Sequence, residues 1–128
     1  KSTWKPIEYI HRADYELVAA AFKNYDCLIV NPLADGMNIV PKEAALMNEK
    51  SGTVILSENA GCYEELAEYV IGVNPFDIRE TADAIYRSIT MNFDERKKLS
   101  DGLKLKVRER TIYHWINEQF DDFERLMK

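Results

Sequence analysis

Hydrophobic and polar residues follow two different periods along the first 75 residues, one typical of strands and one typical of helices. Alternating apolar and polar positions predict a strand over residues 6–10, and short apolar runs predict strands over residues 27–30, 53–56 and 70–73. The uninterrupted runs at 27–30 and 53–56 are typical of strands buried on both faces of a sheet. Strands alternate with helices, which predicts an α/β fold with a parallel sheet and flanking helices.

Apolar residues recur at helical spacing between these strands. Asp14 is expected to cap a first helix, whose apolar face would be Leu17, Val18, Ala21 and Phe22. A second helix is expected over residues 38–48, because Pro41 lacks an amide hydrogen and fits the first helical turn. A third helix is expected to follow the turn at residues 60–61.

Beyond residue 75 the pattern predicts helices only. Asp77 and Glu80 have the spacing of a capping box and precede an apolar face made of Ile78, Ala82, Ile85 and Ile89. Asp94 is expected to open the next helix, with Leu99, Leu103 and Val107 on one side and basic residues on the other. We predict a single domain over residues 1–128, with the sheet in 6–75 and C-terminal helices in 77–127.

Composition excludes several classes of function. The chain has 128 residues, 46% of them hydrophobic, and a formal charge of -5, which argues against nucleic acid or an anionic membrane as the main partner. Acidic residues interrupt the basic run at 96–110, which favours a solvated helix face. Cys27 and Cys62 form no CxxC pair and are expected to be buried thiols in a reducing cytoplasm. No signal peptide or membrane-spanning run is recognisable.

The segment NPLADGMNIVPKE, residues 31–43, carries the candidate chemistry. It follows a predicted strand, at the sheet edge where open parallel sheets bind ligands. The amides of Asn38, Ile39 and Val40 are expected to lack intrahelical partners and to attract a phosphate. Gly36 would let a ligand approach the backbone and could adopt a positive φ. The carboxylates of Asp35 and Glu43 suit the hydroxyls of a sugar, so a nucleotide sugar matches both features.

Purely structural interpretations of the same residues are also open. Asp-Gly is a common turn, Asn a common helix cap, and Glu is favoured near a helix N-terminus without any ligand. In the loop at residues 57–61, the Ala-Gly pair is expected to serve helix packing and Glu58 to act as a cap or supporting group. His11 could line the same crevice, although a lone histidine is more often structural. His114, beside Trp115, is expected to be structural.

Five stretches together carry a family resemblance: NPLADGMNIVPKE, NEKSGTVILSENAG, EEL, VNPFDIRETADAI and TMNFDER. In this order they resemble the C-terminal part of the trehalose-6-phosphate synthase family of retaining glycosyltransferases. The resemblance implies a Rossmann-like domain, the C-terminal portion of a two-domain GT-B enzyme that binds a nucleotide sugar between its domains. By position, Asp35 would be the catalytic carboxylate that holds the transferred glucose. The sugar and diphosphate would be bound by Asp35, Gly36, Met37, Asn38, Ile39 and Val40, and the ribose by Glu43.

The reaction implied by the resemblance moves glucose from a nucleoside diphosphate glucose to glucose 6-phosphate with retention, without metal or cofactor. Ala34 stands where many members carry arginine, which leaves the acceptor open between glucose 6-phosphate, a glycerol phosphate and a cyclitol. Pro41 stands where many members carry alanine and removes one amide beyond those of residues 38–40. The family's diphosphate-binding Arg and Lys, and its acceptor site in the N-terminal domain, come from segments that are missing here. The 128 residues alone are therefore expected to be inactive. A non-catalytic nucleotide-sugar-binding or regulatory domain is the alternative.

The C-terminal stretch is unusually aromatic, with Tyr113, Trp115, Ile116, Phe120 and Phe123 at helical spacing. The resemblance implies a final helix that packs on the missing N-terminal domain. Apolar patches of this size rarely stay bare in solution. We expect the isolated chain to self-associate through residues 113–127; the alternative is that all five residues lie in the domain's own core.

Overall fold

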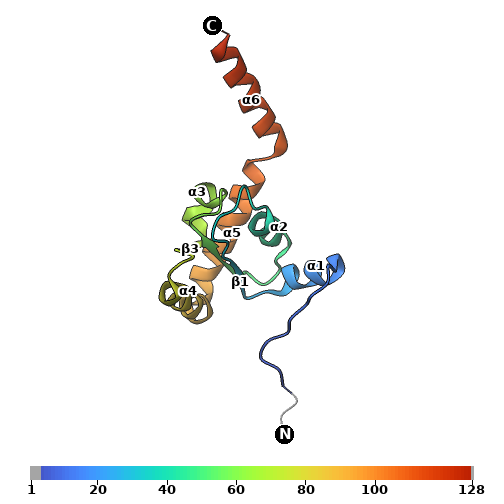
Figure 1. The fold of residues 1–128 in the computed structure, drawn as a ribbon, viewed down its shortest axis with the longest axis vertical. Helices are drawn as coiled ribbons and strands as arrows, with labels where there is room; N and C mark the ends of the chain where they lie inside the picture. Colours follow the sequence, from blue (N-terminus) through green and yellow to red (C-terminus); the bar gives the residue numbers. More distant parts are fainter. Residues whose placement is uncertain (1–3, 128) are drawn as a thin grey trace.

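The fold was examined in a computed structural model, which describes residues 4–127. Within this range the strands form one parallel sheet in the order β1-β2-β3, with Cys27 opposite Thr53 and Ile55 opposite Ile71. Helices surround this small sheet, and the last helix projects away from it (Figure 1). No helix in residues 4–127 combines the length and the apolar character needed to cross a membrane. The elements are α1 (Tyr15–Asn24), β1 (Cys27–Val30), α2 (Val40–Met47), β2 (Thr53–Ser57), α3 (Tyr63–Leu66), η1 (Ala67–Tyr69), β3 (Ile71–Val73), α4 (Ile78–Thr90), α5 (Phe93–Glu109) and α6 (Ile112–Leu126).

The central strand β2 divides the core into two clusters because its side chains alternate between the faces of the sheet. Val54 and Leu56 pack with residues of α2 and α5 on one face, and Ile55 packs with β3 and α4 on the other. All five residues of β2 are buried, as the sequence predicted. The parallel α/β prediction is therefore confirmed, with strand limits within one residue of those expected for β1, β2 and β3.

The strand expected at residues 6–10 is wrong, because this segment pairs with no strand in the described part of the chain. Its alternating apolar residues face solvent, with Ile7 at 81% and Tyr9 at 79% exposure. Alternation of apolar residues indicates that a segment fits a sheet, but a strand forms only where a neighbour supplies the ladder of hydrogen bonds.

Burial of β1 on both faces is also wrong, since Ile29 is 44% exposed and the strand lies at an edge of the sheet. The expected apolar face of α1 is likewise open: Leu17, Val18 and Ala21 are exposed and Phe22 is half-buried. Asp14 does cap α1, accepting a hydrogen bond of 3.1 Å from the Leu17 amide. The local helix signal was therefore correct, while its packing depends on surfaces that residues 4–127 do not supply.

Caps and faces of the C-terminal helices differ in detail from the prediction. Asp77 caps α4, but Glu80 accepts a hydrogen bond from the Asn74 amide instead of completing a capping box. The buried side of α4 carries Ala84 and Ser88, whereas the predicted face, apart from half-buried Ile85, is exposed. Asn92, two residues before Asp94, caps α5. The predicted apolar side of α5 is confirmed, with Leu103 buried and Leu99 and Val107 half-buried.

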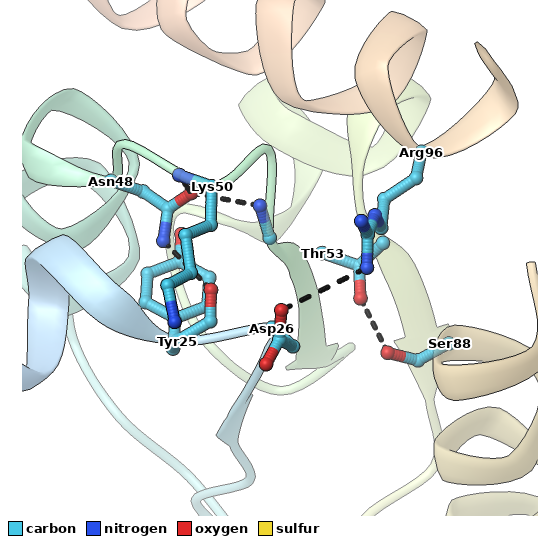
Figure 2. A network of polar contacts seen from close by, with 8 residues as sticks. Tyr25, Asp26, Asn48, Lys50, Thr53, Ser88 and Arg96 are labelled. Atoms are coloured by element: carbon cyan, nitrogen blue, oxygen red, sulfur yellow. Dashed lines mark hydrogen bonds and ion pairs between the residues drawn. The ribbon is translucent and has the colours of Figure 1, made fainter. Parts of the chain in front are cut away.

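Asn48, at the C-terminal end of α2, ties four segments together, and Figure 2 shows its contacts with Tyr25 and Lys50. Its side-chain amide donates to the carbonyls of Phe22 and Tyr25, and its side-chain oxygen accepts from the amides of Lys50 and Gly52. Its own carbonyl accepts from the Lys104 ammonium of α5 at 2.8 Å. Asn48 is only 3% exposed, so these bonds satisfy a buried polar group and hold α2 in place on the sheet.

Helix α6 extends from the body of the molecule and buries none of its residues (Figure 1). Tyr113, Phe120 and Phe123 are each at least 60% exposed, and Trp115 is 54% exposed. The alternative that the aromatic stretch lies in the domain's own core is therefore wrong.

We expect Asn48→Ala to lower the free energy of unfolding by about 2–4 kcal/mol, because it leaves buried amide and carbonyl groups without partners. Urea denaturation followed by circular dichroism measures this change. The matched control is Asn24→Ala, which removes a single bond to Ala20 on the exposed surface of α1 and should cost about 0.5 kcal/mol or less. Equal losses in the two variants would contradict the role assigned to Asn48.

We predict that the 128-residue chain self-associates in a concentration-dependent way through α6, because none of its residues is buried and its aromatic side chains are more than half exposed. Light scattering over a range of concentrations measures the mass. The double variant Phe120→Glu/Phe123→Glu should remain a monomer. A wild-type chain that stays monomeric throughout would show this prediction to be wrong.

Candidate functional site

The loops that follow β1 and β2 are joined beyond the carboxyl ends of the strands. Asp35 and Ala60 form an isolated parallel bridge, in which the Asp35 amide donates to the Asn59 carbonyl at 3.2 Å. The Asn59 side chain donates to the Leu33 carbonyl at 2.8 Å, and the Gly61 amide donates to the Gly36 carbonyl at 2.6 Å. These bonds continue the parallel pairing past the sheet and hold the segment 33–37 against residues 59–61.

Gly61 permits this close approach of two backbones. A Cβ atom at Gly61 would lie 2.3 Å from the Gly36 carbonyl oxygen, closer than atoms can approach. The expected helix-packing role holds for Ala60, which is buried in a cluster with residues of α2, α3 and α5, whereas Gly61 packs against the other loop. A Cβ atom at Gly36 would meet nothing within 4 Å, so the exposed side of the Gly36 backbone is accessible to a ligand, as predicted.

The positive φ expected at Gly36 lies instead at Asn38, where φ is 52°. Asn tolerates this conformation better than most residues because its short side chain can bond locally. Asn38 donates to the Asp35 carboxylate at 2.8 Å and accepts from the Val40 amide at 3.2 Å. As a result α2 begins at Val40 rather than near residue 38, with Ile39 as its N-cap and Pro41 in its first turn.

The amides around this turn form a candidate anion seat, which we define as the backbone of residues 36–39. The Val40 amide, expected to be free, is bonded to Asn38, but the amides from Gly36 to Ile39 make no hydrogen bond within residues 4–127. A left-handed residue followed by the right-handed Ile39 turns successive amides toward one side, a geometry that binds anions. The N-terminal dipole of the eight-residue helix α2 adds positive potential at the same place.

Two carboxylates flank the seat. Asp35, before it, is exposed and is oriented by Asn38. Glu43, in the first turn of α2, is exposed and forms no ion pair within residues 4–127. Hydroxyl donors of a ligand could therefore reach either carboxylate without displacing a buried ion pair.

Two hollows border residues of the site, the first through Glu43 and the second through Met37. The first, the α1–α2 hollow, has a volume of about 370 Å³ and is largely apolar. Its lining comprises Tyr15, Val18, Ala19, Phe22, Glu43, Leu46 and Met47. The second, the α6 hollow, has a volume of about 390 Å³ and is bordered by Met37, Lys42 and Glu65 together with residues 110–118 of the α5–α6 connection and α6.

The remaining candidates play supporting roles or lie elsewhere. His11 stacks on Tyr9 and borders a hollow formed by residues 8–12 and Leu17, so it does not join the seat. His114 pairs with Glu118 at 3.2 Å and borders the α6 hollow. Glu58 does not cap α3; its carboxylate lies by Tyr63, where burial first and Glu58 second raise the pKa of the phenol. No cluster of three His, Cys, Asp or Glu residues suited to a metal occurs within residues 4–127.

Sequence reasoning missed two features of this site. The bracing role of Asn38 was hidden because Asp-Gly suggested that the glycine would take the unusual conformation. The α1–α2 hollow was missed because the apolar face of α1 was assigned to the core. The usable signal was Glu43 itself, which the helical period of α2 places on the same side as the apolar residues Leu46 and Met47.

Comparisons with known proteins place most of this chain in one family. The profile of glycosyltransferase family 20 matches residues 1–125. A validamine 7-phosphate valienyltransferase of Streptomyces hygroscopicus subsp. jinggangensis is 37% identical over 108 residues, 84% of this chain and 22% of that protein. A trehalose-6-phosphate synthase of Klebsiella pneumoniae subsp. pneumoniae is 34% identical over 126 residues, 96% of this chain and 26% of that protein.

A solved structure has the same fold over nearly the whole chain. It is the crystal structure of a UDP-forming alpha,alpha-trehalose-phosphate synthase from Burkholderia xenovorans in complex with glucose-6-phosphate, with a TM-score of 0.84 and 33% identity. The match covers 94% of this chain and 27% of that one. The chain thus spans about a quarter of the length of the proteins it resembles.

The two loop glycines should respond oppositely to alanine. Gly61→Ala should destabilise the chain by about 1–3 kcal/mol, because the new methyl group meets rigid backbone. Gly36→Ala should change stability by about 0.5 kcal/mol or less, since its surroundings are open and its φ is not positive. Urea denaturation of both variants measures the difference. Equal destabilisation would mean that the contact between the loops is not as described.

Proposed function

The chain belongs to glycosyltransferase family 20, and from this premise we propose that it is the nucleotide-sugar-binding half of an enzyme that transfers glucose to a sugar phosphate. The observation that carries the proposal is the seat at residues 36–39, where free amides lie between two exposed carboxylates. The family alone leaves the ligand open. The seat favours a ligand whose central anionic group has hydroxyl groups on both sides, as in a nucleoside diphosphate glucose.

In this proposal the diphosphate lies against the amides at the start of α2. Asp35 accepts hydrogen bonds from hydroxyls of the transferred glucose, and Gly36 and Met37 border the same sugar. Glu43 accepts hydrogen bonds from the ribose. The apolar α1–α2 hollow, which Glu43 also borders, then receives the nucleobase.

The chemistry assigned to these residues is positioning and charge stabilisation. The bond between the anomeric carbon of glucose and the leaving phosphate oxygen breaks. A bond to the acceptor hydroxyl forms on the same face of the sugar, and the leaving phosphate takes the acceptor's proton. The amides of the seat stabilise the negative charge that develops on the diphosphate. Helix-end amides supply only about half a unit of positive charge, so cationic side chains from outside this chain must supply the rest.

The acceptor we propose is glucose 6-phosphate, in line with the synthases of Klebsiella and Burkholderia that the chain resembles. The valienyltransferase, with 37% identity over a shorter stretch, supports a second candidate, transfer to an aminocyclitol phosphate. A non-catalytic nucleotide-sugar-binding domain is the third. Assaying the complete protein with nucleoside diphosphate glucose and each acceptor separates the first two, and tight nucleotide binding without turnover would favour the third.

Asp35→Ala in the complete protein should lower kcat/KM roughly 10- to 150-fold, since a hydrogen bond to a charged group contributes about 1.5–3 kcal/mol. The matched control is Asn38→Gly. It removes the same Asp35–Asn38 bond and tolerates the positive φ, but it keeps the carboxylate. The control should lose less activity than Asp35→Ala, because the carboxylate remains although Asn38 no longer orients it. Equal losses would assign the effect to the turn rather than to a contact between Asp35 and the sugar.

Glu43→Gln should weaken the binding of the nucleoside diphosphate itself about tenfold, even without glucose attached, because its proposed partner is the ribose. Calorimetric titration of the complete protein measures the dissociation constant. Glu49→Gln, at an exposed position just beyond α2, should bind like the wild type. A Glu43 variant that alters only sugar discrimination would reverse the roles given to the two carboxylates.

A further inference from the structure

A half-buried ion pair borders the same hollow as Met37 of the seat. The Lys42 ammonium, in the first turn of α2, donates to the Glu65 carboxylate of α3 at 2.7 Å. The two side chains are only 18% and 12% exposed, whereas the other ion pairs within residues 4–127 each include at least one side chain more than 40% exposed. This pair therefore differs in kind from the surface pairs, which contribute little.

The surroundings of the pair connect it to both loops of the site. Cys62, fully buried at the start of α3, lies within electrostatic reach of Lys42, Glu65 and Asp35. Burial chiefly raises the pKa of the Cys62 thiol, while the Lys42 charge lowers it and the two carboxylates raise it. Lys42 and Glu65 also border the α6 hollow, together with Met37 of the seat. The pair thus spans the same joint as the bond between Gly61 and Gly36.

Stability alone is a weak explanation for such a pair. Taking two charges out of water costs about as much as their attraction returns, and apolar replacements of similar size are often as stable. One oxygen of Glu65 is buried without a hydrogen-bond partner within residues 4–127, so the pair is not optimised for stability. A direct, short bond between α2 and α3 does, however, fix the orientation of the first turn of α2.

Lys42 directly precedes Glu43 in α2, but its ammonium is paired with Glu65 of α3. Because consecutive helical residues point about 100° apart, anchoring Lys42 to Glu65 determines where Glu43 points. The same anchor determines how the amides before Val40 face the ligand. It also keeps the lysine charge away from the Glu43 carboxylate.

We propose that Lys42 and Glu65 are positioning residues, whose ion pair locks the joint between the β1 and β2 loops and thereby sets the geometry of the seat and of Glu43 for nucleoside diphosphate binding. The identity of the ligand rests on the function proposed above, whereas the locking of the joint does not. Neither residue is assigned a contact with the substrate.

The test uses the complete protein in five forms besides the wild type. Lys42→Met and Glu65→Gln each break the pair, Lys42→Arg keeps it, and Lys42→Glu/Glu65→Lys reverses it. Lys97→Met is the matched control, because it breaks an exposed lysine–carboxylate pair on α5. Two quantities are measured in each. The first is hydrogen exchange of the hydrogen-bonded amides in segments 35–40 (Asp35 and Val40) and 59–62 (Ala60 and Gly61). The second is the dissociation constant of uridine, guanosine or adenosine diphosphate, whichever binds the wild type best.

Breaking the pair should speed exchange in both segments about tenfold or more, while β2 keeps its protection. Nucleotide binding should weaken between about tenfold and a hundredfold, the range expected for a misplaced binding group. Lys42→Arg should stay near the wild type, and the charge reversal should recover most of the loss. Lys97→Met should match the wild type in both measurements.

Unchanged exchange and binding in both single variants would overturn the proposal. So would faster exchange throughout the domain, β2 included, because that result describes a loss of global stability. If the single variants fail to fold, the reversed pair and Lys42→Arg provide the test. Folded protein with wild-type binding in both variants supports the proposal. Weak binding in both overturns it. A wild type that binds none of the nucleotides refutes the proposed function, and local exchange alone then decides whether the pair locks the joint.

Discussion

The hydrogen bond from the Gly61 amide to the Gly36 carbonyl is the contact on which the candidate site depends. At 2.6 Å it brings two loops together that belong to different strands, and no residue larger than glycine fits at position 61. The bridge between Asp35 and Ala60 lies beside it. Because the loops are fixed to each other, the turn at Asn38 and the start of α2 are held relative to β2, the strand that is buried throughout. A surface loop thereby takes on the rigidity of the core.

The electrostatics of the seat follow from this arrangement. Its positive potential comes from backbone amides and a helix end, because Lys42 is paired with Glu65. Both nearby free carboxylates, Asp35 and Glu43, repel a bare anion. A ligand is therefore favoured only if it brings hydroxyl donors to both sides of its phosphates. This requirement explains why a chain with a net charge of -5 can serve a phosphorylated substrate, provided that further cations approach from another part of the protein.

Local signals in the sequence were sufficient for elements whose neighbours lie in the chain. The apolar run of β2, the Asp14 and Asp77 caps and the buried side of α5 were all predictable, because each depends on residues close in sequence or on the core they build. The strand at residues 6–10 and the burial of α1 were not, since burial depends on partners that a periodic pattern does not identify. The site showed the same division. Residues 35–43 could be identified from the sequence as a group. That Asn38 rather than Gly36 has the positive φ is seen only in the backbone geometry.

The central claim is that the joined loops present preformed amides to a nucleoside diphosphate sugar. Backbone amide chemical shifts of the 128-residue chain, recorded during titration with uridine, guanosine and adenosine diphosphate glucose, test it directly. The account predicts that one of these ligands shifts the amides of residues 36–39 and of Glu43 together, at high ligand concentration, while the loop after β3 stays unchanged. Shifts confined to α6, or shifts that spare residues 36–39 in the presence of every ligand, would contradict it.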